Sequence, residues 1–444
     1  MLLKTFTLGG VHPEESKISS DCPIRQLSLP PIVTVPLAQH IGAPAAAIVA
    51  KGDKVKVGQL IGKGQSFISA NVHSPVSGSV LKIDDFMDSS GYRKKAIQIA
   101  TEGDEWLETI DRSESLKEEI TLSREEILSR IKDSGIVGMG GATFPTHVKM
   151  MVPEGKKAEC LIINGVECEP YLTSDHRLML EKGEELMVGT RILMTALGVE
   201  KAYIGIENNK PDAISYLEKI SLRHSGVEIV PLKVKYPQGG EKQLIKAVLN
   251  REVPSGKLPI ETGCVVQNVG TAVAVYEAVQ KNKPLIERVV TVTGKLVKSP
   301  CNLLVRIGTP ISMLLEEAGG LPEDTLKIIN GGPMMGKAVG STDIPVIKGM
   351  SGLVVMDSKA AKRPVVSHCI RCARCSFACP MGLAPYLIAQ MTEAQLIEQT
   401  ESEGVMDCME CGSCSFTCPS GRPLLDNIRI AKSKVGQLMR TRAK

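Results

Sequence analysis

Two runs of cysteines near the C-terminal end are the residues whose types and spacing most directly indicate chemistry. In each run the first three cysteines are separated by two residues, the fourth follows after three more, and a proline comes next. The runs are Cys369, Cys372, Cys375 and Cys379, and then Cys408, Cys411, Cys414 and Cys418. This spacing is typical of thiolates that hold two [4Fe–4S] clusters, with the fourth cysteine of each run ligating the other cluster.

Cross-ligation divides the eight cysteines into two predicted ligand sets. One is Cys369, Cys372, Cys375 and Cys418, and the other is Cys408, Cys411, Cys414 and Cys379. Two zinc sites are the alternative, because four thiolates also close a tetrahedron around zinc. Disulfides are disfavoured in a long chain that begins without a secretory leader. Two neighbouring clusters would carry single electrons, so we expect a donor or an acceptor site elsewhere in the chain.

A glycine-dense stretch is the second candidate site. Gly138, Gly140 and Gly141 precede Phe144 at the predicted start of a helix, and Lys149 follows. Glycines let the backbone approach a phosphate or a flat ring, and a helix N-terminus favours an anion. The stretch does not match G-x-G-x-x-G, so a tight structural turn stays open as an alternative.

Polar side chains also follow a predicted apolar strand over residues 160–164. Asn164, Glu167 and Glu169 stand at its carboxyl end, where open α/β sheets bind ligands. An amide can donate to and accept from a ring edge, and carboxylates can accept from ribose hydroxyls or a nicotinamide amide. Solvated loop carboxylates are the alternative. Two weaker turns lie downstream, at 236–242 and at 268–271.

The elements that must position these residues indicate a multidomain α/β protein. We expect a β domain over 1–100, an acidic linker and helix over 101–134, and an α/β domain over 135–283. A small α+β module over 284–357 and a ferredoxin-like helical domain over 358–444 complete the chain. About three domains is the usual number for 444 residues, so this division is reasonable.

Within the α/β domain, strand and helix patterns alternate. Strands are predicted over 160–164, 201–207 and 227–234, and helices over 184–197, 211–223, 241–250 and 272–281. Alternation of this kind predicts a parallel sheet covered by helices. Further helices are predicted near 311–318 in the α+β module and over 383–399 between the two cysteine runs.

The N-terminal β domain resembles the lipoyl or biotinyl barrel-sandwich. The resemblance rests on the turn over 52–59 and on Ser-Pro-Val-Ser-Gly-Ser-Val over 74–80. No lysine flanked by methionine stands at the hairpin between them. We therefore expect a structural barrel and not a swinging-arm carrier.

Composition excludes some classes of function. The net charge is +4 and only 3% of the residues are aromatic, which disfavours nucleic-acid binding. No run reaches the roughly 18 apolar residues of a membrane span. The five remaining cysteines share no ligand spacing, and we expect most to be small buried side chains: Cys22, Cys160, Cys168, Cys264 and Cys301.

The C-terminal segment is basic. Asp426 is its single acid against seven cations, which are Arg422, Arg429, Lys432, Lys434, Arg440, Arg442 and Lys444. A solvated helix face is one interpretation. An acidic partner or an anionic membrane surface is the other.

The glycine stretch and the strand end together resemble a known family. Gly-x-Gly-Gly-Ala-x-Phe-Pro-Thr-x-x-Lys over 138–149, followed by Asn-x-x-Glu-x-Glu-Pro over 164–170, is similar to the flavin-bearing, NADH-binding subunit of respiratory complex I. The whole chain more closely resembles the RnfC family, which belongs to the Rnf ion-translocating electron-transport complex. That resemblance adds Gly-Gly-Val-His-Pro over 9–13, the stretch 36–44 and the order of the domains.

The resemblance implies FMN, NAD(H) and two [4Fe–4S] clusters as cofactors, and a β-grasp (SLBB) fold for the α+β module. It places FMN and the dinucleotide against Gly138, Gly140, Gly141 and Phe144, with Lys149 near the flavin. It lines FMN with Asn164, Glu167, Asn268 and Thr271, and puts Glu169 and Glu241 on the NADH side. No protein nucleophile is expected, because flavin links hydride transfer to one-electron clusters.

The function that the resemblance implies is that of a peripheral NAD(H)-oxidoreductase subunit of a membrane complex. It would exchange electrons between ferredoxin-type carriers and NAD on the cytoplasmic face, while membrane and ferredoxin-like partner subunits move ions. Two alternatives stay open. One is an NADH-dependent cobalamin reductase of the propanediol-utilisation type, and the other is a non-catalytic electron relay or docking subunit that has lost its flavin.

Overall fold

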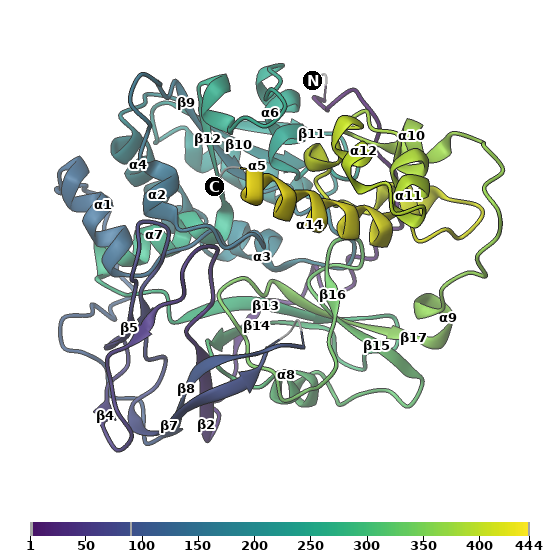
Figure 1. Ribbon diagram of the computed structural model, residues 1–444. Helices are drawn as coiled ribbons and strands as arrows, with labels where there is room; N and C mark the ends of the chain where they lie inside the picture. The colour runs from purple at the N-terminus through teal and green to yellow at the C-terminus, as the bar shows by residue number, and fades with distance from the viewer. Residues whose placement is uncertain (1–2, 89–90, 443–444) are drawn as a thin grey trace.

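A four-stranded parallel sheet lies in the upper part of the computed structural model as drawn in Figure 1, and the structure describes residues 3–88 and 91–442. Its strands lie in the order β11-β10-β9-β12, and every pair is parallel. Their bounds are β9 (Cys160–Asn164), β10 (Ala202–Glu207), β11 (Val227–Leu232) and β12 (Cys264–Asn268). The first three strands progress in one direction and β12 returns to the far side of β9. The strand order therefore reverses between β9 and β12, and the region outside the carboxyl ends of these strands, here called the crevice, is where open α/β sheets bind ligands.

Helices cover both faces of this sheet, as predicted. Along β9, Leu161 and Ile163 belong to one core whereas Cys160 and Ile162 belong to another, because alternate residues of a strand face opposite sides. The first core is covered by α1 (Arg124–Asp133), α3 (Ser174–Glu181), α4 (Gly183–Leu197), α5 (Pro211–Ser221) and α7 (Val269–Lys281). The second is covered by α6 (Glu241–Leu249). Short segments α2 (Thr146–Met150) and η1 (Pro259–Thr262) complete this domain.

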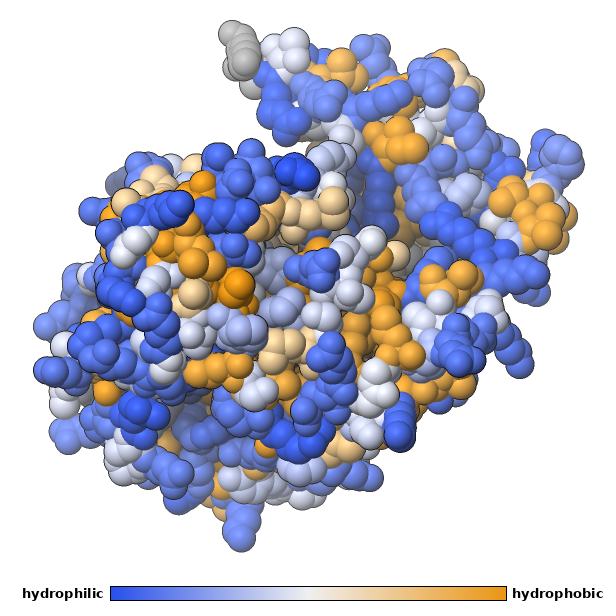
Figure 2. Space-filling view, turned by 90° about the horizontal axis from the view of Figure 1, so that it is seen from below, coloured by the Kyte–Doolittle hydropathy of each residue, from blue (hydrophilic) through white to orange (hydrophobic). Residues whose placement is uncertain are grey.

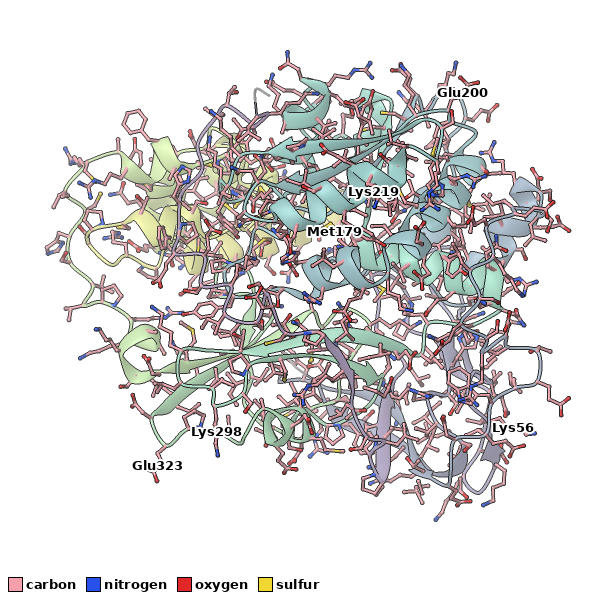
Figure 3. The ribbon with its side chains drawn as sticks, turned by 180° about the vertical axis from the view of Figure 1, so that it is seen from behind. Lys56, Met179, Glu200, Lys219, Lys298 and Glu323 are labelled. Atoms are coloured by element: carbon pink, nitrogen blue, oxygen red, sulfur yellow. The ribbon has the colours of Figure 1, made fainter. Side chains whose placement is uncertain are left out.

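The N-terminal β domain is built from two small sheets that enclose one apolar core. One sheet has the order β2-β8-β7-β4 and the other β3-β5-β6. Their strands are β2 (Ile32–Pro36), β3 (Ala46–Ala47), β4 (Lys54–Val55), β5 (Leu60–Lys63), β6 (Val72–His73), β7 (Gly78–Met87) and β8 (Arg93–Thr101). Figure 3 shows this barrel, marked by Lys56, beside the module that carries Lys298.

The α+β module is a six-stranded mixed sheet in the order β1-β14-β13-β17-β15-β16, with α8 packed on it. Its elements are β13 (Glu287–Thr293), β14 (Cys301–Arg306), α8 (Ile311–Glu317), β15 (Thr325–Asn330), β16 (Lys337–Ala338) and β17 (Gly352–Asp357). The sixth strand, β1 (Ile24–Gln26), comes from the N-terminus and pairs with β14.

The N-terminal segment therefore differs from the expected barrel unit over 1–100. Residues before β2 run across the other domains. Lys4 bridges to Leu232 of the parallel sheet, Val11 bridges to Tyr236, and the Gly10 N–H donates to the Ala378 carbonyl among the C-terminal helices. Alternating apolar patterns identify strands but do not show which sheet a short strand such as β1 joins.

The C-terminal domain is helical and carries both cysteine runs. It contains α9 (Ser358–Ala361), α10 (Arg374–Ala378), α11 (Pro385–Glu393), α12 (Ile397–Ser402), η2 (Val405–Asp407), α13 (Ser413–Thr417) and α14 (Leu424–Arg442). The helix expected over 383–399 is two helices, with Gln395 between them in a left-handed conformation at φ 60°. Over the described residues, no helix is long and apolar enough to span a membrane.

Lys348 lies at the junction of the barrel, the α/β domain and the β-grasp module. Its side chain is 1% exposed, and its ammonium donates to the carbonyls of Asn71 and Gly135, both at 2.7 Å. Burial lowers the pKa of this lysine to about 7. The folded protein thus holds fewer protons at this site than the unfolded chain between pH 7 and pH 10.5.

We expect Lys348→Met to remove a pH-dependent part of the stability. Lys348 binds its proton more weakly in the folded state, so its contribution to stability rises with pH from about 7 to about 10, by at most ~1.4 kcal/mol per pH unit. Chemical denaturation across this range measures the difference between wild type and variant. The exposed Lys359→Met is the control, and a difference that does not change with pH would contradict the prediction.

Candidate functional site

Two asparagines face each other at the switch point of the parallel sheet. Asn164 ends β9 and Asn268 ends β12, and the two are register partners. The Asn164 amide donates to the Gly239 carbonyl at 2.8 Å, while its oxygen accepts from the Val166 N–H at 3.2 Å. The Asn268 oxygen accepts from the Gly270 N–H at 2.8 Å and so caps α7. Both amides therefore fix loops at the mouth of the crevice.

The glycine loop lies over this crevice. The Met139 N–H donates to the hydroxyl of Thr271 at 2.9 Å, and the Gly138 N–H donates to the Phe144 carbonyl at 2.9 Å. A side chain at Gly140 would contact Asn268 at 3.4 Å. Gly141 has φ +112° and open space where a side chain would be. The loop thus presents bare backbone beside the asparagines, which fits a flat or anionic ligand.

Glu167 caps a helix beside the crevice. Its carboxylate accepts from the N–H groups of Asp175 at 2.8 Å and His176 at 3.1 Å, at the start of α3. Asp175 lies half-buried next to it and accepts from the Asn268 amide at 2.7 Å. Burial, together with the nearby charge of Glu167, raises the pKa of Asp175. These contacts link the ends of β9, β12 and α3 into one polar cluster.

Lys149 and Glu241 form an ion pair at the edge of the site, with 2.5 Å between the ammonium nitrogen and a carboxylate oxygen. Lys149 is on α2, directly after the glycine loop, and Glu241 begins α6. Both side chains are partly exposed. The structure thus brings these two predicted residues together across the domain.

Glu169 is turned toward the β-grasp module. Its carboxylate accepts from the N–H groups of Met334 at 3.0 Å and Met335 at 2.8 Å. The hydroxyl of Tyr236 lies 3.3 Å away and also donates to the Cys411 carbonyl at 2.8 Å. Burial raises the pKa of Glu169 to about 7. Glu169 and Tyr236 therefore join the crevice domain to the β-grasp turn and to a cysteine loop.

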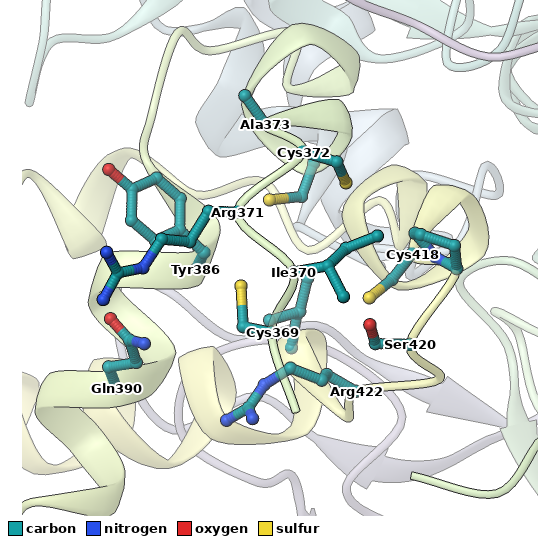
Figure 4. A pocket seen from close by; sticks show the side chains of 13 residues that line it. Cys369, Ile370, Arg371, Cys372, Ala373, Tyr386, Gln390, Cys418, Ser420 and Arg422 are labelled. Atoms are coloured by element: carbon teal, nitrogen blue, oxygen red, sulfur yellow. The ribbon is translucent and has the colours of Figure 1, made fainter. Parts of the chain in front are cut away.

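Four of the cysteines line one cavity in the C-terminal domain, with a volume of about 380 Å³. They are Cys369, Cys372, Cys375 and Cys418, which is the first predicted ligand set. Figure 4 shows the thiols of Cys369, Cys372 and Cys418 turned toward a common space. Cys372 is exposed and Cys375 is buried, so this cavity lies at the surface. Its four thiols are the donor set that a cubane cluster requires.

The other four cysteines are close enough to influence one another's titration. Burial raises the pKa of the Cys414 thiol to about 12, and neighbouring thiolates contribute. Those neighbours are Cys408, Cys411 and Cys379. Cys379 and Cys411 are buried as well. Among the described residues, no group of His, Cys, Asp or Glu converges closely enough to hold a single metal ion.

Much of the predicted basic face is engaged within the domain. Arg429 and Lys432 both pair with Glu410, at 3.0 Å and 3.2 Å, and Arg422 pairs with Glu393 at 2.6 Å. Lys432 also donates to the Cys408 carbonyl at 2.5 Å. These cations therefore hold the loops around the cysteines, and Lys444 lies outside the described residues.

Comparison with known proteins identifies the family. The chain is 48% identical to the C subunit of the proton-translocating ferredoxin:NAD(+) oxidoreductase complex of Clostridium ljungdahlii, over 98% of this chain and 94% of that protein. It belongs to the RnfC family. The corresponding subunit of the Na(+)-translocating complex of Acetobacterium woodii is 44% identical, over 96% of each chain. That of the ion-translocating oxidoreductase complex of Rhodobacter capsulatus is 41% identical, over 98% of this chain and 84% of the relative.

Family models divide this RnfC-family chain into four regions. Residues 4–104 match the RnfC barrel sandwich hybrid domain, 131–277 the Nuo51 FMN-binding domain, 289–338 the SLBB domain and 363–419 a 4Fe-4S dicluster domain. FMN and [4Fe–4S] clusters are thus its cofactors. This confirms the prediction that the cysteines hold iron–sulfur clusters, in preference to the alternative of two zinc sites. The predicted fold class is also confirmed.

A solved structure shares the fold of this RnfC-family chain. The NAD+-reducing [NiFe]-hydrogenase in its H2-reduced state has a chain with a TM-score of 0.52 and 18% identity, covering 72% of this chain and 67% of that chain. At this identity the likeness concerns the fold alone.

The structure adds residues that the sequence patterns did not indicate. Half-buried Asp175 and buried Lys210 lie beside the crevice, and Lys17 reaches it from the N-terminal segment. Three of the five other cysteines are buried: Cys160, Cys264 and Cys301. A lysine in a polar N-terminal stretch carries no spacing signal, and only a contact over 150 residues reveals its role.

Proposed function

We propose that this chain is the peripheral NAD(H)-oxidoreductase subunit of a membrane Rnf complex. It exchanges electrons between NAD(H) and ferredoxin-type carriers, using FMN and two [4Fe–4S] clusters, while partner subunits translocate ions. The observation that carries the proposal is that one chain combines a dinucleotide-type switch point at Asn164 and Asn268 with two sets of four thiols. By analogy with the family, the subunit lies on the cytoplasmic face of the membrane.

The predicted site residues have distinct tasks in this proposal. Gly138, Gly140 and Gly141 supply bare backbone, and Asn164 and Asn268 offer amides to a ring edge. The Lys149–Glu241 pair and Phe144 lie on the side of the site that binds NAD(H). Glu169 contacts the turn of the β-grasp module. FMN, when bound, supplies the chemistry that links hydride transfer to one-electron carriers. The chain's residues orient it and exclude water.

The domain contacts support an order for the two clusters. Tyr236 donates to the Cys411 carbonyl, and Gln243 donates to the Pro380 carbonyl at 3.3 Å. The second ligand set, Cys408, Cys411, Cys414 and Cys379, therefore lies against the α/β domain. The cavity with Cys372 lies at the surface. We infer that the second set is the inner station and the first set is the outer one.

The proposal is tested on the reconstituted, anaerobic protein. Flavin binding and NADH-driven bleaching of the flavin and cluster absorbance are measured, together with NADH oxidation by an artificial acceptor. Binding and bleaching are expected. A protein that binds neither FMN nor NADH would overturn the enzyme proposal and leave only an electron relay.

The surface near the outer cavity is expected to meet the one-electron partner. Phe377 is 79% exposed between two cluster cysteines, and Ile370, also exposed, lines the cavity. Arg371 and Arg374 are exposed beside them, which favours an acidic, ferredoxin-like partner. On the face seen from below, apolar side chains are interspersed with hydrophilic ones (Figure 2).

We expect Phe377→Asp to slow electron exchange with a ferredoxin by about tenfold, because truncating a central aromatic contact costs about 1.4 kcal/mol or more in many interfaces. NADH oxidation by a small artificial acceptor should be unchanged. Leu222→Asp is the control, since Leu222 is 87% exposed at the end of α5. Equal rates for the two variants with ferredoxin would contradict this docking surface.

A further inference from the structure

The N-terminal segment is bound along the loop that carries Glu167 and Glu169. The Tyr171 N–H donates to the Glu15 carbonyl at 2.8 Å, and the Ser19 and Thr173 hydroxyls lie 2.7 Å apart. Further along, Arg177 donates to the Ser20 carbonyl. A segment from the start of the chain thus follows the loop from β9 to α3 over its whole length.

Lys17 makes the central contact between the two. Its ammonium donates to three main-chain carbonyls of the loop, those of Glu167 at 2.7 Å, Glu169 at 2.9 Å and Leu172 at 2.7 Å. An ammonium has three N–H groups, so its donors are all used. Burial lowers its pKa to about 8, and the nearby charge of Lys210 contributes.

The loop needs such a contact because its backbone is strained. Glu167 has φ +46° and Tyr171 has φ +72°, a conformation that costs non-glycine residues about 1 kcal/mol or more each. The loop carbonyls also converge, since the buried Lys210 ammonium binds the Val166 carbonyl at 2.8 Å. Four carbonyls are thus gathered around two cations. A loop released from them would relax to extended backbone and leave buried carbonyls without donors.

The shape of this loop decides where the Glu167 carboxylate lies. With its carbonyl held by Lys17, Glu167 directs its carboxylate to the N-terminus of α3, beside Asp175 and the Asn268 amide. Moving the loop would withdraw the cap from α3 and disturb Asn268 at the switch point. Lys17 reaches the crevice only through the main chain of the loop.

We infer that Lys17 is a positioning residue of the FMN site, which acts by fixing the loop over 166–172. This inference rests on the proposed function, since it assumes that the switch-point crevice holds FMN. Methionine has similar length but no donor, so Lys17→Met removes three hydrogen bonds. Arginine keeps the charge but presents its donors in a planar fork, which does not match three convergent carbonyls.

The experiment compares wild type, Lys17→Met and Lys17→Arg, all as full chains with reconstituted clusters. FMN dissociation constants are measured by flavin fluorescence, and amide hydrogen exchange is measured on the flavin-free protein. We expect Lys17→Met to raise the dissociation constant at least tenfold and Lys17→Arg to raise it less. Amide hydrogen exchange of Lys17→Met should be faster over 166–176 in the flavin-free state, while its iron content should equal that of wild type.

A matched control contacts the same segment. Lys295 pairs with the exposed Glu14 at 2.9 Å, and over the described residues its ammonium donates to Glu14 and to no carbonyl of the loop, so Lys295→Met should leave FMN affinity and exchange unchanged. Unaltered FMN affinity in Lys17→Met would overturn the inference, as would faster exchange spread evenly over the chain. If Lys17→Met does not fold, the FMN dissociation constant and the amide hydrogen exchange of Lys17→Arg test the inference instead. A wild-type protein that fails to bind FMN refutes the proposed function instead.

Discussion

Replacing Cys379 with serine is expected to remove the inner cluster and spare the outer one. Cys379 belongs to the first cysteine run, yet its thiol is among those that influence Cys408 and Cys414. The surface cavity is lined by Cys369, Cys372, Cys375 and Cys418 without it. Serine is a poor ligand for the iron of a cubane, so the set with Cys379 should lose its cluster.

The expected result is a fall from about eight to about four irons per chain. Electron transfer from NADH to ferredoxin should drop by orders of magnitude, because the inner station is lost, while flavin reduction by NADH persists. Iron analysis, electron paramagnetic resonance and stopped-flow absorbance measure these effects.

Two further variants test the pairing of the ligand sets. Cys418→Ser should remove the outer cluster in the same way. Cys22→Ser is the control, because its thiol only donates to the Pro300 carbonyl, which a hydroxyl can also do. Loss of the outer cluster in Cys379→Ser, with the inner one intact, would refute the cross-ligation.

Asn268→Asp should be the most damaging single change at the crevice. The Asn268 amide donates to the half-buried Asp175 carboxylate at 2.7 Å, with Glu167 nearby. An aspartate keeps the acceptor that caps α7 but replaces the donor by a third carboxylate. Leaving a buried charge without its partner typically costs about 3–5 kcal/mol. We therefore expect a loss of stability of about 3 kcal/mol and at least a tenfold loss of FMN affinity.

Denaturation and flavin titration at neutral pH measure both effects. Lowering the pH to about 5 should recover part of the stability, because a protonated carboxyl can again donate a hydrogen bond. The exposed Gln437→Glu is the control, expected within about 0.5 kcal/mol of wild type. A variant that binds FMN as tightly as wild type would exclude Asn268 from the site.

The central domain could be predicted largely from the sequence. The strand over 160–164 and most of the helices that follow have strong apolar periodicity and clear boundaries, and the predicted elements agree with the observed ones to within a few residues. Helix α3 and strand β12 were not predicted. The order of the strands in the sheet could not be predicted from apolar periodicity, because β12 is only five residues long and follows a 3-10 turn. The pairing of Asn164 with Asn268 depends on that strand order.

For the two cysteine sets as well, part of the arrangement could be predicted from the sequence and part depends on contacts in the folded structure. Spacing alone predicted two groups of four, because a cubane imposes a short and regular repeat on its ligands. Spacing did not indicate which group lies nearer the flavin domain, since that depends on Tyr236 and Gln243, which are remote in sequence. Likewise, Glu169 follows a strand end as predicted, but its carboxylate turns to Met334 and Met335 of another domain.

The path of the N-terminal segment has a consequence for biosynthesis. The buried Asn302 donates to the carbonyls of Ser19 and Cys22, and β1 pairs with β14 in the same place. Ser19 leaves the ribosome 283 residues before Asn302, an interval of roughly 15–60 s at ordinary rates of translation. During that interval the first strand has no partner, and the loop that Lys17 fixes is synthesised about halfway through it. Complete assembly of the flavin domain therefore awaits translation of the β-grasp module.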